Sequence, residues 1–319
     1  MSDMKKSVAL RVDKQIGWLE LDLQGEKVNK FSEPVLIRFK EVLEEIKANG
    51  DIKVLVVISK KPKIYIAGAD INEIKRINTE EEFLKAVQAG QGIMNDFEDL
   101  KIPVVAAISG ACAGGGCEFA LACDYRIASD DRSTKIGLPE TKLGILPGFG
   151  GCVRLPRVIG LVESLGIILA GKLVPAKKAL KIGLVDKTYP VEIFESKAEE
   201  FALGLIKKGA KKRRKTFSGK GMAAKLMHAP VLRGMIYSGA KKNVMKLTKG
   251  HYPAPLEALQ VVKETYGSSD RTKSLKREAD GFLKVATTDI SKNLIGLFFM
   301  TEDIKKPQGF QDLMLNPVK

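Results

Sequence analysis

The chain has 319 residues, and its 45% hydrophobic and 29% charged content is that of an ordinary folded protein. No apolar run reaches the ~18 residues that span a membrane, and the start "MSDMKKSVAL" lacks the apolar core of a signal peptide, so we expect a cytoplasmic protein. The net charge of +15 is concentrated in residues 201–250, where fourteen Lys and Arg stand without one Asp or Glu, which favours an anionic partner for that region.

The first part of the chain alternates between strand and helix patterns. "VALRV" and "IGWLEL" predict a β-hairpin within residues 7–22. "SEPVLIRFKEVLEEIKANG" predicts a helix with Ser32 as its N-cap and Gly50 as its stop. "VLVVIS" (54–59) is apolar up to its last residue, as is typical of a strand buried on both faces. Asp70 is then the expected N-cap of a helix over "INEIKRI".

The same alternation continues through the middle of the chain. A helix is predicted over roughly residues 79–100, Pro103 opens the strand "VVAAIS", and the glycine run from Gly114 begins the next helix. "YRIAS" is again a strand, whereas "KIGLPE" and "LGILPGFGG" read as connecting loops. Strands that alternate with helices indicate an α/β fold with mostly parallel pairing.

After about residue 191 the strand patterns stop and helical patterns take over. "ESKAEEFALGLIKKGAKKRRKTF" predicts a helix with a basic end, and amphipathic helices are expected over 217–250 and near 271–300. Pro307, Gly309 and Pro317 give the tail the composition of a linker. We therefore divide the chain into a catalytic core, a basic helical region, and a helical extension with its linker: residues 1–190, 191–255 and 256–319.

The segment "GGGCE", Gly114 to Glu118, places a bare backbone beside a carboxylate in an apolar sequence. At a helix start, unpaired N–H groups and the helix dipole can bind a phosphate or stabilise a carbonyl oxygen that becomes negative during a reaction. The alternative is that Glu118 only complements the helix dipole and that the glycines allow tight packing. The motif alone favours neither interpretation.

Two further motifs follow the same pattern. "IAGAD" brings a glycine loop to a helix start and offers the N–H of Ala69. In "GLPETKLGILPGFGG", Glu140 is a second carboxylate, with a first-turn helix residue as the alternative. A dinucleotide-binding fingerprint is excluded there, because Val153 stands where its third glycine would fall. Two loops with N–H donors and two glutamates would suit proton chemistry beside a thioester carbonyl.

Cysteine and histidine offer little other chemistry. Three of the four cysteines lie in one apolar stretch, none forms a C-x-x-C pair, and we expect all of them to be reduced and buried. The only histidines are His228 and His251, so the chain has few histidines from which a Cys–His or His–zinc site could be built. No metal site is therefore predicted.

Four ordered segments carry a resemblance to a known family. "IAGADINEI", "ACAGGGCEFALACDYRIAS", "GLPETKLGILPGFGGCVRLPRVIG" and "LAGKLVPAKKALKIGLVDKTY" resemble the crotonase (enoyl-CoA hydratase/isomerase) superfamily over roughly residues 7–190. "LTKGHYPAPLEALQVV" and "ISKNLIGLFFMTEDIKK" look like the helical segment of multifunctional fatty-acid oxidation proteins, in which a hydratase domain precedes a 3-hydroxyacyl-CoA dehydrogenase domain. The resemblance implies a crotonase-like ββα spiral with an all-helical C-terminal extension.

The resemblance also implies roles for individual residues. Glu118 and Glu140 match the catalytic pair, one activating water for attack at C3 and the other handling the proton at C2. Ala69 and Gly115 match the oxyanion-hole donors. Four more positions match the substrate-binding backbone: Ala67, Gly68, Gly114 and Gly148. We interpret Asp70 mainly as a helix cap, with a role in substrate binding as the alternative.

The implied activity is the hydration of trans-2-enoyl-CoA to 3-hydroxyacyl-CoA in fatty-acid β-oxidation, without metal or redox cofactor. The alternative in the same class is a delta3-delta2-enoyl-CoA isomerase. The spacing of 22 positions between Glu118 and Glu140 is about two longer than that of close relatives, and we place the extra length in a turn at "SDDRSTK". The chain reaches "NPVK" without a GxGxxG strand, so we expect neither NAD binding nor dehydrogenase activity.

The expected substrate is an acyl-CoA, and the basic region suggests further partners. A thiolase subunit and an anionic membrane surface are the candidates, and a homo-oligomer is a further option. Nucleic-acid binding through residues 201–250 is the alternative from another class. It has little support, because only Phe201, Phe217 and Tyr237 are available there for stacking on bases.

Overall fold

Two sheets with mostly parallel strands form the α/β part of the protein. The computed structural model describes residues 2–77, 79–209, 212 and 230–305. The larger sheet has the strand order β1-β2-β3-β5-β7-β10, and only its first pair is antiparallel, in the hairpin that the sequence predicts. Its strands are β1 (Val8–Asp13), β2 (Ile16–Leu21), β3 (Val54–Ser59), β5 (Val104–Ile108), β7 (Tyr125–Ser129) and β10 (Lys187–Tyr189).

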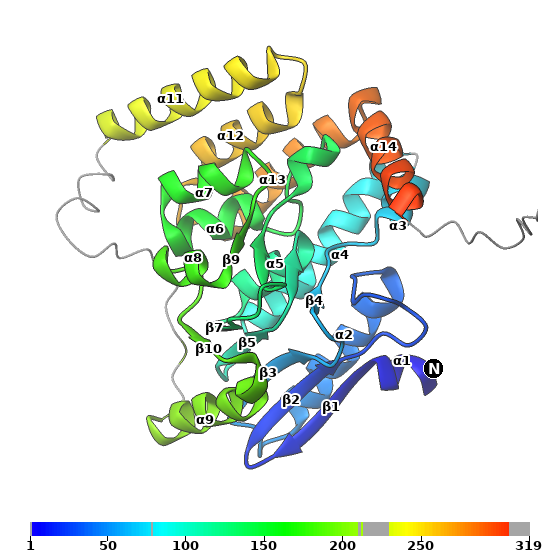
Figure 1. Cartoon of the computed structure of the whole chain (residues 1–319), viewed down its shortest axis with the longest axis vertical. Coiled ribbons are helices and arrows are strands. Elements are labelled where there is room, and N and C mark those ends of the chain that lie inside the picture. Colours follow the sequence, from blue (N-terminus) through cyan, green and yellow to red (C-terminus); the bar gives the residue numbers. More distant parts are fainter. Residues whose placement is uncertain (1, 78, 210–211, 213–229, 306–319) are drawn as a thin grey trace, which may run out of the picture.

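Helices cover both faces of this sheet (Figure 1). Leu55 and Val57 of β3 belong to the main core with α2 (Glu33–Ala48) and α5 (Gly115–Ala122), whereas Val54 and Val56 pack with α9 (Phe194–Lys207) on the opposite face. Neighbouring residues of a strand point to opposite faces. A strand buried on both faces has no polar positions, which explains the apolar run Val54–Ile58 of β3.

A second, smaller sheet has the order β4-β6-β8-β9, and its first three strands are parallel. The interpretation of "KIGLPE" as a connecting loop missed strand β8 and the start of the 3₁₀ helix η1 (Glu140–Leu143). Each strand has three residues, which is too short for a recognisable alternation. The strands are β4 (Ile64–Ile66), β6 (Ala111–Ala113), β8 (Lys135–Gly137) and β9 (Leu173–Pro175).

Two helix starts illustrate how polar side chains replace missing backbone partners. Asp70 accepts a hydrogen bond from Asn72 N and caps α3, as predicted. Ser32 stands at the N-cap of α2 as predicted, but its side chain makes no capping bond. The N–H of Glu33 donates instead to the carboxylate of Glu73, at 3.2 Å from each oxygen. That bond ties α3 to the start of α2.

The helices of the α/β part lie around the two sheets, and the sequence analysis predicted α2, α3, α4 and α5 but not α1 or α6. They are α1 (Ser2–Ser7), α2 (Glu33–Ala48), α3 (Ile71–Arg76), α4 (Glu80–Glu98), α5 (Gly115–Ala122), α6 (Gly151–Ile159), α7 (Leu161–Ile168), α8 (Ala176–Lys181) and the 3₁₀ helix η2 (Val191–Ile193).

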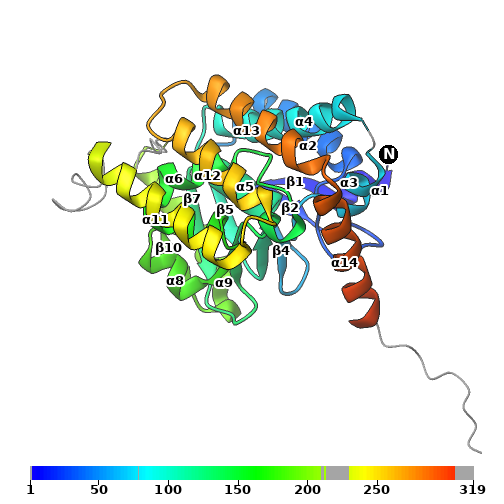
Figure 2. The same cartoon turned by 90° about the horizontal axis from the view of Figure 1, so that it is seen from above.

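Within the described residues, only helices follow η2, in agreement with the prediction for the second part of the chain. α12 and α13 pack against α6, α13 also packs against α4, and α14 lies beside α3 and η1 (Figures 1 and 2). Residues of α12 and α13 belong to the same hydrophobic core as the α/β part. These helices are α9, α11 (Pro230–Thr248), α12 (Pro253–Thr265), α13 (Arg271–Ala286) and α14 (Asp289–Lys305).

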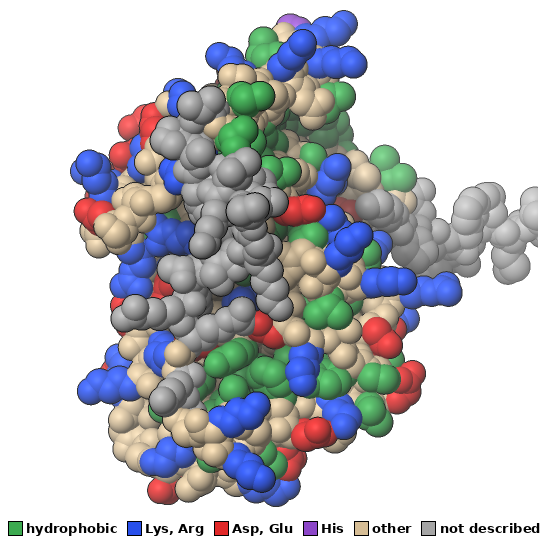
Figure 3. Space-filling model, turned by 90° about the vertical axis from the view of Figure 1, so that its left-hand side faces the viewer, with side chains coloured by type: hydrophobic (Ala, Val, Ile, Leu, Met, Phe, Trp, Pro, Cys, Tyr) green, Lys and Arg blue, Asp and Glu red, His purple; other side chains and the backbone are tan. Residues whose placement is uncertain are grey.

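Part of the basic region lies outside the described residues. Six of its fourteen cations lie outside them: Lys211, Arg213, Arg214, Lys215, Lys220 and Lys225. The predicted linker from residue 306 and the part of the predicted helices that covers 217–229 also lie outside the described residues. On the face drawn in Figure 3, Lys and Arg are spread over the surface with Asp and Glu among them. Across the described helices, none has the length and hydropathy to cross a membrane. The four cysteines are free and buried, as predicted.

Gly116 shows how closely α5 approaches β4. A Cβ at this position would lie 2.3 Å from the carbonyl oxygen of Ile66. We expect Gly116→Ala to lower the unfolding free energy by about 1–3 kcal/mol, because such overpacking forces the backbone apart. Gly92→Ala in α4 is the control, since nothing lies within 4 Å of a Cβ there. Thermal unfolding tests both variants, and a Gly116→Ala melting temperature equal to that of wild type would contradict this account of the packing.

Candidate active site

The carboxyl ends of three parallel strands bring the predicted site residues together. Residues 67–70 follow β4, Gly114 and α5 follow β6, and Glu140 lies three residues beyond β8. Ligands commonly bind at such an edge of a parallel sheet. All nine predicted residues line one pocket, which has a volume of about 700 Å³. They are Ala67, Gly68, Ala69, Asp70, Gly114, Gly115, Glu118, Glu140 and Gly148.

Each of the three glycines of the run is favoured at its position for a different structural reason. Gly114 has φ 54° and ψ −128°, a conformation that side chains with a Cβ rarely adopt. Gly116 is required by the approach of Ile66. Gly115 faces the pocket, where a Cβ would lie 3.3 Å from ring atoms of both Phe31 and Phe149. The glycine run therefore keeps the start of α5 accessible from the pocket.

Two backbone N–H groups at this point have no acceptor among the described residues. The bonds from Phe31 N to Gly68 O and from Asp70 N to Phe31 O, both 2.8 Å, hold the loop that contains Ala69. Within the described part of the chain, neither Ala69 N–H nor Gly115 N–H donates a hydrogen bond. A Cβ built on Gly115 would lie 3.4 Å from Ala69 N, so both donors border the same space. The arrangement can stabilise a negative oxygen.

Asp70 fixes the position of this loop. Its carboxylate caps α3 and also pairs with Lys30, at 3.0 Å between Oδ2 and Nζ. These partners lower its pKa against the effect of burial. The predicted capping role is confirmed, and the side chain also borders the pocket.

Glu118 is 2% exposed, and its Oε1 accepts two backbone hydrogen bonds. Phe149 N donates at 2.8 Å and Gly151 N at 2.7 Å, from the segment that begins α6. Burial raises the pKa of Glu118 to about 7, while the two N–H groups act in the opposite direction. The side chain can therefore exist in either protonation state near neutral pH.

Glu140 has a different environment. It is 9% exposed, and no other described residue donates a hydrogen bond to either carboxylate oxygen. Burial raises its pKa well above the usual value, and the negative charge of Glu118 raises it further. A Cβ on Gly114 would lie 3.2 Å from Glu140 Oε1, so the glycine run also leaves room for this carboxylate.

The turn in which we place the extra residues between the two glutamates is present. Asp131 accepts from Ser133 N at 2.7 Å, and Thr134 N donates to the backbone oxygen of Asp131 at 2.9 Å. This turn lies between β7 and β8, away from the pocket lining. The extra residues therefore do not prevent Glu118 and Glu140 from lining the same pocket.

The sequence analysis missed three residues near the site, two of them from α13. Glu278 is fully buried, and it accepts from Gly150 N at 2.5 Å and from Cys152 N at 2.9 Å. Phe282 lines the pocket, one helical turn further on. Gln91 of α4 donates to the backbone oxygen of Gly148 at 3.0 Å.

A signal for Glu278 exists in the sequence. Leu275, Phe282 and Val285 form an apolar stripe at helical spacing in α13, and Glu278 lies on that stripe. A carboxylate on the buried face of a helix requires a partner elsewhere in the protein.

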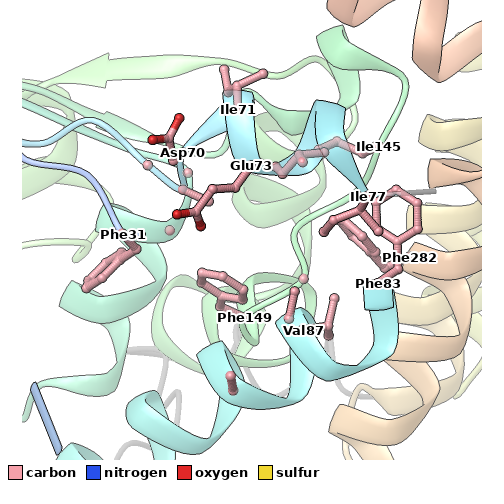
Figure 4. A pocket seen from close by; sticks show the side chains of 18 of the residues that line it. Phe31, Asp70, Ile71, Glu73, Ile77, Phe83, Val87, Ile145, Phe149 and Phe282 are labelled. Carbon is pink, nitrogen blue, oxygen red and sulfur yellow. The ribbon is translucent and has the colours of Figure 1, made fainter. Parts of the chain in front are cut away.

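The rest of the pocket is largely apolar (Figure 4). Phe31 and Asp70 lie at one end, and Phe149 lies in the middle. Phe83 of α4 and Phe282 of α13 meet at the other end, with 6.1 Å between ring centroids and an edge-to-face geometry. This end can take an apolar chain, whereas the donors and carboxylates suit a reactive polar group.

Comparisons with known proteins agree with this geometry. A family model described as "Enoyl-CoA hydratase/isomerase" matches residues 14–229. The chain belongs to this family. The crotonase-like fold and the enzyme class that the motifs imply are thereby confirmed.

Among curated proteins, the chain is 43% identical over 301 residues to a "Fatty acid oxidation complex subunit alpha" of Aliivibrio fischeri, with 93% of this chain and 42% of that protein covered. It is 40% identical over 310 residues to the protein of the same name from Shewanella amazonensis, with coverage of 97% and 43%. The chain thus spans about two fifths of these relatives.

Solved structures show the same fold. An enoyl-CoA hydratase from Bacillus anthracis has a TM-score of 0.59 and 29% identity, and the match covers 81% of this chain and 96% of the other. The human mitochondrial delta3-delta2-enoyl-CoA isomerase has a TM-score of 0.65 and covers 94% and 99%. At 23% identity the second match shows the fold alone.

The raised pKa of Glu140 makes a prediction about stability. A carboxyl that holds its proton more tightly when folded contributes most below its unfolded pKa of about 4.5, and that contribution is lost as pH rises through the folded pKa. Glu140→Gln has no such titration. We therefore expect its melting temperature, relative to wild type, to increase between about pH 5 and about pH 8.

The control is Glu81→Gln, whose side chain is 78% exposed and pairs with Lys85 at the surface. Its melting-temperature difference from wild type stays flat over the same pH range. A flat difference for Glu140→Gln as well would show that Glu140 is not held in the protonated form by the fold.

Proposed function

We propose that the chain is an enoyl-CoA hydratase, which adds water across trans-2-enoyl-CoA to give 3-hydroxyacyl-CoA. One observation carries the proposal: two buried glutamates with different hydrogen-bond environments border a pocket that also presents two unused backbone N–H groups. Hydration of a conjugated thioester needs a base for the water, an acid for C2, and stabilisation of the enolate oxygen.

The two environments assign the roles. Glu118 receives two N–H bonds that favour its ionised form, so it takes a proton from the water that attacks C3. Glu140 is held protonated by burial and by the charge of Glu118, so it delivers a proton to C2. In the active state the pair carries one proton, which is on Glu140.

The electrons of the double bond are accommodated at the thioester oxygen. As the water oxygen bonds to C3, the electron pair moves onto that oxygen, which Ala69 N–H and Gly115 N–H would hold. Each such donor contributes about 3 kcal/mol of barrier lowering in comparable sites. The enolate then collapses as C2 takes the proton of Glu140. Every charge and proton has a group in the chain, so we propose that the reaction uses neither metal nor NAD.

The names of the relatives suggest a physiological role. Both curated relatives are named as alpha subunits of a fatty acid oxidation complex. We infer that this chain acts in fatty-acid β-oxidation on acyl-CoA substrates and that it associates with another protein of that pathway. The basic region, including Lys241, Lys242 and Lys246 of α11, remains the candidate for a thiolase subunit or an anionic membrane surface.

Isomerase activity is the second candidate. The family model includes isomerases, and the fold also matches that of a delta3-delta2-enoyl-CoA isomerase. Moving a double bond from C3 to C2 transfers one proton between two carbons, which a single carboxylate can perform. The same pocket and oxyanion donors would serve both reactions.

Loss of enoyl absorbance tests the hydratase activity with crotonyl-CoA and longer trans-2-enoyl-CoA substrates. We expect Glu118→Gln and Glu140→Gln each to lower kcat by about 100- to 10,000-fold, because each removes one proton-transfer step. Glu81→Gln, at the surface, keeps the wild-type rate.

Two outcomes would contradict the proposal. One is a wild-type protein that is inactive on every chain length, and the other is full activity in both glutamate variants. Conversion of a trans-3-enoyl-CoA by a protein that does not hydrate trans-2-enoyl-CoA would identify an isomerase instead.

A further inference from the structure

Two glutamates from opposite sides cap the first turn of α6. Its N-cap is Gly150, which has no side chain to accept the unpaired N–H groups of a helix start. Four consecutive N–H groups alternate between two acceptors: Phe149 and Gly151 donate to Glu118, and Gly150 and Cys152 donate to Glu278.

Glu278 comes from α13, beyond the residues 14–229 that the family model matches. It is completely buried, and Gln91 Nε2 lies 3.4 Å from its Oε1. Burying a carboxylate is costly unless it is hydrogen-bonded, whereas an apolar side chain would fill the same place on the helix without that cost. What the carboxylate adds is a pair of acceptors for the loop.

We propose that Glu278 is a positioning residue for the reaction. By accepting from Gly150 and Cys152, it fixes the first turn of α6 so that Phe149 and Gly151 orient the carboxylate of Glu118. This inference rests on the proposed function, because it gives Glu278 its effect through a catalytic Glu118.

The geometry explains why Glu118 depends on this second acceptor. Without Glu278, two buried N–H groups lose their partner, and such groups rarely stay unpaired. The other carboxylate that accepts from this turn is Glu118, so the turn would shift until the freed N–H groups share Glu118 as their acceptor. Gln91 and Arg154 hold only carbonyl oxygens of this loop, those of Gly148 and Phe149, and cannot replace an acceptor.

Two substitutions test the proposal. Glu278→Met keeps the approximate volume and removes both acceptors, and Glu278→Gln retains one acceptor oxygen. We expect kcat on a trans-2-enoyl-CoA to fall by about 10- to 100-fold in Glu278→Met, with KM changed less than about threefold. Glu278→Gln gives an intermediate kcat.

Glu257→Met is the matched control. Glu257 is a second buried glutamate of the extension, in α12, but it pairs with Arg277 at 2.8 Å and Lys284 at 2.6 Å rather than with the loop. Its loss lowers stability and leaves kcat unchanged. Equal loss of kcat in the Glu257 and Glu278 variants would overturn the proposal, as would wild-type kcat in both Glu278 variants.

A measurement without turnover separates this inference from the function. Hydrogen exchange at the amides of residues 149–152 is expected to be faster in Glu278→Met and unchanged in Glu257→Met, because only the first variant removes acceptors from that turn. If wild type hydrates no enoyl-CoA, the proposed function fails while exchange still reports on the loop. Unchanged exchange in Glu278→Met overturns the positioning role in either case.

Discussion

The first turn of α6 is the feature on which the site depends. Its backbone N–H groups are the only hydrogen-bond donors that Glu118 Oε1 has among the described residues. A carboxylate that is 2% exposed would otherwise be strongly disfavoured, so this turn makes the buried carboxylate possible. The same turn is held from its other side by Glu278 of α13. The helical extension therefore contributes to the site, as well as to the hydrophobic core.

The smaller sheet determines where everything else stands. Because β4, β6 and β8 run parallel, the segments that follow them emerge at one edge: the loop of Ala69, the glycine run, and the turn that carries Glu140. The hydrogen bond from Gly114 N to Gly137 O joins two of these segments directly. Residues separated by more than seventy positions thus meet in a single pocket. Their proximity depends on three strands of only three residues each.

Much of this organisation could be predicted, and the exceptions have physical causes. The hairpin, the buried strand β3 and the capped helix α3 follow from local patterns, and three of the four motifs contain the nine predicted pocket residues. The strands of the second sheet are too short to show alternation. Glu278 is separated from its partners Gly150 and Cys152 by more than a hundred residues, so no local pattern connects them. Its place on an apolar stripe was the one available clue, and it indicates a buried partner without indicating which.

Glu140 is a buried carboxyl group without a hydrogen-bond donor from any other described residue, an arrangement that lowers stability. Natural proteins pair almost all their buried polar groups, yet neither oxygen of this carboxylate has a donor from another described residue. Glu118 and Glu278 show that the fold can supply backbone donors to buried carboxylates within the same core. Leaving Glu140 without them keeps its proton available, since each donor would favour the ionised form. The difference between Glu118 and Glu140 is therefore one of hydrogen-bond donors, and it is the basis of the different roles proposed for two side chains of the same type.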